Sequence, residues 1–163
     1  MTRIVVISDT HTRSLKGLPK KLVKELSQAD IVVHCGDYTS ITLLDELRRL
    51  AKRFIGVHGN VDPREIRDEL PDKTVFEVEG RRIGVIHPPW GGPPWGIEEY
   101  IAKEFEEVDI ILFGHTHDVC HETIGGVVFL NPGQAYPSFV TPASAGIVTI
   151  GQEGIEVEIR TFE

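Results

Sequence analysis

Side chains that can bind metal ions follow five apolar, strand-like runs of this sequence, each at the point where the run ends. They comprise two carboxylates, one amide and four imidazoles: Asp9, His11, Asp37, Asn60, His87, His115 and His117. Mixed imidazole and carboxylate ligands suit Mn, Fe or Zn better than Ca or Mg. These ligands exceed what one ion uses, so two ions that share Asp37 are indicated. Two ions about 3.5–4 Å apart can clamp a phosphate ester and deprotonate the water between them.

The spacing of these side chains matches one strand-helix unit at a time. The intervals are 28 residues from Asp9 to Asp37, 23 to Asn60, 27 to His87 and 28 to His115. In open α/β sheets the carboxyl ends of the strands line the ligand crevice, so we expect these groups to converge on one rim. Taken singly, an Asp or Asn after Gly is more often a turn former or a helix cap. The complete set favours a metal site.

Alternating strands and helices must position the ligands. The first part of the chain predicts strands over 3–8, 31–34 and 54–58 and helices over 15–29 and 41–51, a rhythm typical of parallel strands joined by helical crossovers. The second part predicts a hairpin, a helix and short strands: 75–78 with 83–86, 97–107, 110–113, 119–124, 127–130, 145–150 and 155–160. We therefore expect an α/β fold with two packed sheets, helices outside, and one domain over 1–163.

Composition limits the class of protein. The chain has 163 residues and a formal charge of −8, which argues against a non-specific nucleic-acid binder. Two cysteines are too few for a disulfide scaffold. No apolar run reaches the ~20 residues of a membrane span, and the N-terminus does not resemble a signal peptide. These features predict a soluble cytoplasmic protein with reduced thiols, no membrane partner and no stable nucleic-acid complex.

The order of the motifs resembles the calcineurin-like metallophosphoesterases. The chain contains D-x-H at Asp9, G-D at Asp37, G-N-x-D at Asn60, a lone His87 and G-H-T-H ending at His117. Its length and the loop Asn131-Pro132-Gly133 look like the small bacterial and archaeal phosphodiesterase branch, and the resemblance extends from Arg3 to about Ile150. It implies a four-layer α/β sandwich of two packed mixed β-sheets flanked by helices. It also implies two divalent transition-metal ions, Mn first, with Ni, Fe or Zn as alternatives.

The resemblance also assigns roles to the ligands. One ion would be held by Asp9, His11, Asp37 and His117, and the other by Asp37, Asn60, His87 and His115. The implied reaction is hydrolysis of a phosphodiester, with a small or nucleotide-like substrate, by in-line attack of a metal-bound hydroxide. Asp37, as the shared ligand, and Asn60 are the residues expected to be catalytic.

Three positions depart from the family pattern. Val61 stands where larger members have a histidine after the Asn, Pro88-Pro89 follows His87 where the small branch often has H-G-H, and Ser40 replaces the last Asp of G-D-x-x-D. Without an imidazole acid, catalysis should favour esters with good leaving groups or depend on metal and water alone. His58 is an alternative catalytic group or a packed core histidine.

Further candidates surround the predicted rim. Trp90 and Trp95 lie in a Pro- and Gly-rich stretch over 88–96, where they would form either an aromatic platform for a flat leaving group or a cover for a core edge or oligomer contact. Asp62 would support a ligand or cap a helix that begins at Pro63. Asn131 is expected in a turn that offers backbone N–H groups to phosphate.

Two other functions stay open at this point. A phosphomonoesterase could use the same centre, and a non-catalytic protein-binding scaffold of the same fold, like the retromer subunit, could retain part of it. The intact pair of Asp9 and His11 weighs against the scaffold. A homo-oligomer is compatible with the sequence.

Overall fold

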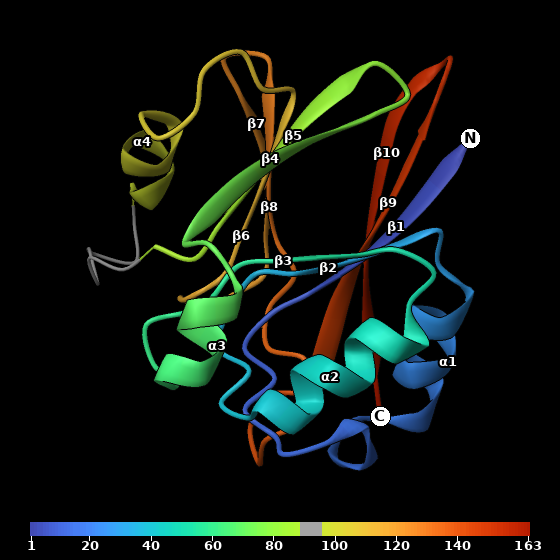
Figure 1. Ribbon diagram of the computed structural model, residues 1–163. Coiled ribbons are helices and arrows are strands. Elements are labelled where there is room, and N and C mark those ends of the chain that lie inside the picture. Colours follow the sequence, from blue (N-terminus) through green and yellow to red (C-terminus); the bar gives the residue numbers. More distant parts are fainter. Residues whose placement is uncertain (89–95) are drawn as a thin grey trace.

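The computed structural model describes residues 1–88 and 96–163, which form two five-stranded β-sheets packed face to face (Figure 1). The first sheet has the order β10-β9-β1-β2-β3. Its strands β1, β2 and β3 run parallel, and β9 and β10 are antiparallel additions beside β1. Their bounds are β1 (Thr2–Ile7), β2 (Ile31–His34), β3 (Phe54–Gly56), β9 (Ala143–Gly151) and β10 (Gly154–Phe162).

The second sheet has the order β4-β5-β6-β8-β7. Strands β5, β6 and β8 run parallel, whereas β4 and β7 pair antiparallel at the two edges. The bounds are β4 (Lys73–Val78), β5 (Arg81–Ile86), β6 (Ile110–Phe113), β7 (Cys120–Ile124) and β8 (Val127–Asn131). Both sheets are thus mixed, with parallel strands at their centres.

Helices cover the outer faces of the two sheets. A short 3-10 turn, η1 (Leu15–Gly17), and the helices α1 (Lys20–Gln28), α2 (Ile41–Leu50) and α3 (Arg64–Glu69) belong to the side of the first sheet, and α4 (Ile97–Ala102) lies against the second (Figure 1). The expected four-layer sandwich is confirmed. Within the described residues, no helix is long and apolar enough to cross a membrane.

Strand β1 explains why the first sheet is apolar on both faces. Successive side chains of a strand point to opposite faces, so Ile4 and Val6 enter the core between the sheets while Val5 and Ile7 face the helices. All four side chains are fully buried. The continuous apolar run therefore fits a central strand of the first sheet, with the second sheet on one face and helices on the other.

Two predicted helices are shorter in the structure. The helix expected over 15–29 begins at Lys20, because Pro19 has no N–H for an interior helical hydrogen bond and stands at the N-cap. The helix expected over 97–107 ends at Ala102. Beyond its end, the ring of Phe105 packs closely against Gly84 of β5, where an added Cβ would lie 2.9 Å from the ring. Neither difference moves the loops that follow the strands.

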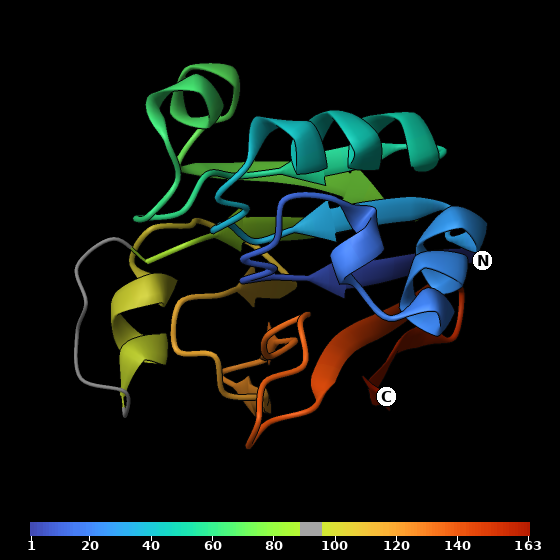
Figure 2. The ribbon, with the colours of Figure 1, turned by 90° about the horizontal axis from the view of Figure 1, so that it is seen from below.

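The parallel strands of each sheet bring their following loops to one side of the molecule. Figure 2 shows the arrows of β1 and β2, in dark and light blue, pointing the same way, with the loops after them adjacent. The backbone of these loops is joined directly: the N–H of Asp9 donates to the carbonyl of Gly36 at 2.9 Å. This edge is where the predicted ligands must meet.

Candidate metal centre

The seven predicted ligands come together at this edge from both sheets. Loops after the first sheet's parallel strands carry Asp9 and His11 (after β1), Asp37 (after β2) and Asn60 (after β3). Loops after the second sheet carry His87 (after β5) and His115 with His117 (after β6). Side-chain and backbone contacts join these loops to one another, so the sequence-distant groups form one cluster.

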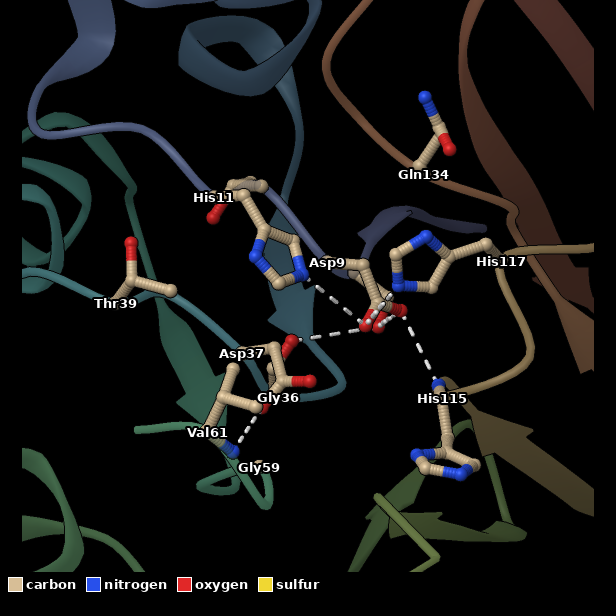
Figure 3. Close-up of polar contacts among 12 residues, drawn as sticks. Asp9, His11, Gly36, Asp37, Thr39, Gly59, Val61, His115, His117 and Gln134 are labelled. Atoms are coloured by element: carbon tan, nitrogen blue, oxygen red, sulfur yellow. Dashed lines mark hydrogen bonds and ion pairs between the residues drawn. The ribbon is translucent and has the colours of Figure 1, made fainter. Parts of the chain in front are cut away.

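One part of the cluster is centred on Asp9. Figure 3 shows the side chains of Asp9, His11 and His117 pointing toward one another. Oδ1 of Asp9 lies 3.3 Å from Nε2 of His117 and 3.8 Å from Nε2 of His11. Two ligands of one ion, each bonded at about 2.1 Å, are separated by about 3.0–3.4 Å. The three side chains are therefore close to the spacing that one shared ion requires.

A second part of the cluster adjoins the first. Nε2 of His87 lies 3.2 Å from Oδ2 of Asp37 and 2.8 Å from Oδ1 of Asn60. Nδ1 of His115 lies 3.2 Å from the same oxygen of Asn60. These four are the side chains that the resemblance assigns to the second ion.

Asp9 is the carboxylate that belongs to two sets of closely spaced ligand atoms. Ligand atoms of Asp9, Asp37 and His87 all lie within 4.8 Å of one another, as do those of Asp9, His11 and His117. Asp37 belongs to one of these two groups. Its assignment as the bridging ligand stays a prediction.

Two buried atoms test whether the cluster fits a metal ion. Oδ1 of Asp9 and Nε2 of His11 are buried and make no hydrogen bond within the described residues. The other oxygen of Asp9 is occupied, because it accepts from the hydroxyl of Ser8 at 2.7 Å and from the N–H of His115 at 3.2 Å. Buried polar atoms without partners are costly unless something else binds them. A carboxylate oxygen that faces imidazole nitrogens offers the ligand atoms that a divalent transition metal prefers, so these residues fit such an ion.

The backbone at the ligands is strained. Asp9, His11, Asp37, His115 and His117 have φ angles of 51°, 45°, 64°, 85° and 62°, in the left-handed region that non-glycine residues rarely adopt. Each such residue costs of order 1–3 kcal/mol and persists only where surrounding structure holds it. These left-handed residues lie in the loops after β1, β2 and β6, and such strain is typical of functional sites.

Glycines beside the ligands permit close approach. A Cβ on Gly36 would lie 2.6 Å from Nδ1 of His87, and one on Gly59 would overlap the carboxylate and backbone N of Asp37. These steric conflicts therefore explain why glycine precedes Asp37 and Asn60 in the sequence motifs.

Asp62 organises two of the loops. Its buried carboxylate accepts backbone N–H groups of Asp37 at 2.9 Å, Thr39 at 2.8 Å and Gly59 at 2.7 Å. It makes no capping hydrogen bond to α3, whose N-cap is Pro63. Of the two roles considered from the sequence, the hydrogen bonds of Asp62 therefore favour support of the ligand loops.

Two opposing effects determine the pKa values in the cluster: burial disfavours the charged form of a side chain, and a neighbour of opposite charge favours it. Burial alone would raise the pKa of Asp9, but the imidazoles of His11 and His117 outweigh it and hold that pKa well below its usual range. The pKa of His117 is raised, chiefly by its contact with Asp9. Burial and the neighbouring His87 lower the pKa of His115. The site is therefore strongly polarised around an ionised Asp9.

The remaining sequence candidates have different positions. Asn131 is buried, donates from Nδ2 to Oγ1 of Thr116 at 2.9 Å and accepts the N–H of Gly133 at 3.0 Å, so it ties two loops rather than facing outward. The ring of half-buried His58 approaches the carbonyl of Gly59 at 3.4 Å, and its catalytic role stays a prediction. Trp90 and Trp95 lie outside the described residues.

Two residues near the cluster were not predicted from the sequence. Ser8, directly before the D-x-H motif, is buried against Asp9. Tyr136 places its ring edge-on to His11, with ring centres 5.5 Å apart. Ser8 adjoins a predicted ligand and could have been inferred, whereas nothing in the sequence pattern signals Tyr136.

Comparison with known proteins identifies a family for the chain. Residues 2–153 match the model of the calcineurin-like phosphoesterase superfamily domain. A probable metallophosphoesterase of Methanocaldococcus jannaschii is 38% identical over 134 residues, which cover 80% of this chain and 66% of that protein. A phosphodiesterase of the same archaeon is 27% identical over 161 residues, covering 91% of this chain and 90% of that one.

Solved structures give the same fold. A Thermotoga maritima protein determined by NMR has a TM-score of 0.78 at 34% identity, covering 99% of this chain and 100% of that one. A single-substitution variant of Vps29 from Entamoeba histolytica has a TM-score of 0.74 at 26% identity, covering 99% of each chain. With the family match spanning nearly all of the sequence, the chain belongs to the calcineurin-like phosphoesterase superfamily.

Proposed function

We propose that this protein is a metal-dependent phosphodiesterase that hydrolyses small or nucleotide-like phosphoesters at a dinuclear centre. The observation that carries the proposal is the buried Oδ1 of Asp9, which makes no hydrogen bond within the described residues and faces two imidazoles next to a second group of ligand atoms. Similarity to the archaeal phosphodiesterase supports a diester as substrate.

The chain's own residues would hold two ions. Asp9, His11 and His117 would bind one, and Asn60, His87 and His115 the other, with Asp37 shared. When bound, two divalent ions supply Lewis-acid stabilisation of the phosphoryl oxygens and lower the pKa of the attacking water. Mn is the first candidate, with Ni, Fe and Zn as alternatives for this mixed nitrogen and oxygen donor set.

The residue after Asn60 limits the choice of substrate. Val61 is 50% exposed beside the cluster, and its backbone N–H donates to Oδ1 of Asp37 at 2.9 Å. This side chain has no proton to give to a leaving group. We therefore expect a preference for esters whose leaving groups need no general acid, such as aryl esters.

The test begins with chelator-treated protein reloaded with Mn, Ni or Zn. Bound metal per chain is measured, and hydrolysis of an aryl diester is compared with that of an aryl monoester. Turnover of the diester, with two ions per chain, is the expected result. Monoester turnover alone would establish the phosphomonoesterase instead, and no hydrolysis despite bound metal would favour the non-catalytic scaffold.

A pair of histidine variants controls for general effects. His117→Ala removes a nitrogen 3.3 Å from Asp9, whereas His121→Ala removes an exposed imidazole of β7 that belongs to neither ligand group. Only the first should lose metal and turnover. Equal losses in both variants would contradict the site.

A further inference from the structure

A buried histidine stands between two of the ligand loops without being a ligand. His34 is the last residue of β2 and is fully buried. Its Nε2 lies 3.1 Å from Oγ1 of Thr10, and its Nδ1 accepts the backbone N–H of Gly36 at 3.0 Å. Its ring stacks on Tyr38, with centres 3.7 Å apart and planes inclined by 14°. Each polar atom of the ring is therefore used.

These contacts determine the tautomer. A ring nitrogen that accepts an N–H carries no proton, so Nδ1 is bare and Nε2 carries the hydrogen that is donated to Thr10. Burial lowers the pKa of His34 to about 3, so the ring is neutral at physiological pH. A neutral imidazole with one acceptor and one donor can join two loops with a defined orientation.

The two partners of the ring adjoin metal-ligand candidates. Thr10 lies between Asp9 and His11, and Gly36 immediately precedes Asp37. The same two loops are joined by the N–H of His11, which donates to the carbonyl of Asp37 at 3.4 Å. Because Asp9, His11 and Asp37 all have positive φ, their loops need external contacts to hold them.

We propose that His34 is a positioning residue, whose ring holds the Asp9–His11 loop and the Asp37 loop at the separation that joint metal binding requires. The inference rests on the proposed metal centre. It assigns His34 a role through Thr10 and Gly36, with no contact to the ions or to substrate. A histidine that only fills the core would affect stability alone.

Three substitutions separate the two hydrogen bonds of the ring. His34→Asn places an amide oxygen where Nδ1 was, which keeps the hydrogen bond to Gly36, but the side chain is too short to reach Thr10. His34→Gln places an amide nitrogen near the position of Nε2, which keeps the hydrogen bond to Thr10 but loses the one to Gly36. Thr10→Val removes the Thr10 bond from its other end and leaves His34 in place.

The measurements are metal affinity by calorimetry with Mn, kcat and KM for the aryl diester, and melting temperature. We expect His34→Asn and Thr10→Val each to weaken Mn binding by about 10–100-fold, as loss of outer contacts to ligands does, and to lower kcat at saturating substrate. The double variant, His34→Asn with Thr10→Val, should weaken Mn binding no more than either single variant, because both substitutions remove the same hydrogen bond. In the metal-free wild type, ¹⁵N chemical shifts should give the Nε2–H tautomer.

Leu26→Ala is the matched control. Leu26 is fully buried in α1, in the core beside the first sheet, so its truncation leaves a cavity and should lower the melting temperature without touching the ligand loops. If the His34 and Thr10 variants melt lower but keep wild-type Mn affinity and kcat, or if their losses add in the double variant, the proposal is wrong. Should His34→Asn not fold, Thr10→Val alone decides between these results. Wild-type protein that binds no Mn would refute the metal centre instead.

Discussion

Two clusters of side chains that could hold a metal ion occur in the described residues, and they differ in how the chain builds them. Glu98, Cys120 and Glu122 present ligand atoms within 4.8 Å of one another, as closely as the atoms around Asp9. Yet Glu122 is exposed, and Glu98 and Cys120 are only half-buried. They project from α4 and β7, with no left-handed φ at any of the three.

Protonation separates the two clusters further. Burial, together with the carboxylates of Glu98 and Glu122, raises the pKa of Cys120 to about 12. A thiol binds metal as the thiolate, so this environment opposes coordination. Around Asp9, by contrast, the pKa of the carboxyl is held low and the ligand is ionised. Proximity of ligand atoms therefore does not separate the two clusters, whereas a buried acceptor oxygen without a hydrogen bond, on backbone with positive φ, occurs at the cluster around Asp9.

The largest expected effect comes from removing a charge at the centre. Asp37→Asn should lower turnover at least about 100-fold and reduce bound metal, because a neutral amide replaces a carboxylate ligand next to His87. Metal analysis and aryl-diester assays measure both. The matching change at the second cluster, Glu122→Gln, should alter neither quantity. Near-normal turnover of Asp37→Asn would contradict its assignment as the shared ligand.

A smaller effect is expected from the glycines that allow close approach. Gly59→Ala places a methyl group against Asp37 and should cost about 1–3 kcal/mol of stability together with weaker metal binding. Gly151→Ala is the control, since its Cβ would meet Met1 no closer than 3.8 Å. Denaturant unfolding and Mn titration of both variants give the comparison. Identical Mn affinities would show that the contact with Asp37 does not shape the centre.

The smallest effect concerns the second cluster itself. With its pKa raised to about 12, Cys120 should stay protonated at pH 8 and react with iodoacetamide at least about ten-fold more slowly than a free thiol. The rate should climb as pH rises toward 12, because the thiolate fraction grows, and added Mn should not change it. Mass spectrometry of the modified peptide follows the reaction. Protection by Mn would place an ion at Glu98, Cys120 and Glu122 and abolish the contrast between the clusters.

Much of the architecture could be predicted because each signal is local. Continuous apolar runs gave β2 and β6 at their observed bounds, and helical spacing gave α2 to within one residue. Pro19 limited the first helix, a signal present in the sequence but outweighed there by the apolar spacing. Donors placed after successive strands indicated one rim, and the contacts among Asp9, His87 and His115 join the same loops.

The amino-acid sequence alone determined the set of candidate ligands and their order along the chain, and it predicted their meeting at one edge because parallel strands bring their carboxyl ends together there. Only the tertiary structure decided which ligand faces which. The N–H of His115 reaches Asp9 across 106 residues of chain, and the carboxylate of Asp62 collects backbone groups from the loops after β2 and β3. The positive φ angles of the candidate ligands and the position of His34 between two loops likewise arise from tertiary packing, where long-range contacts outweigh local backbone preference.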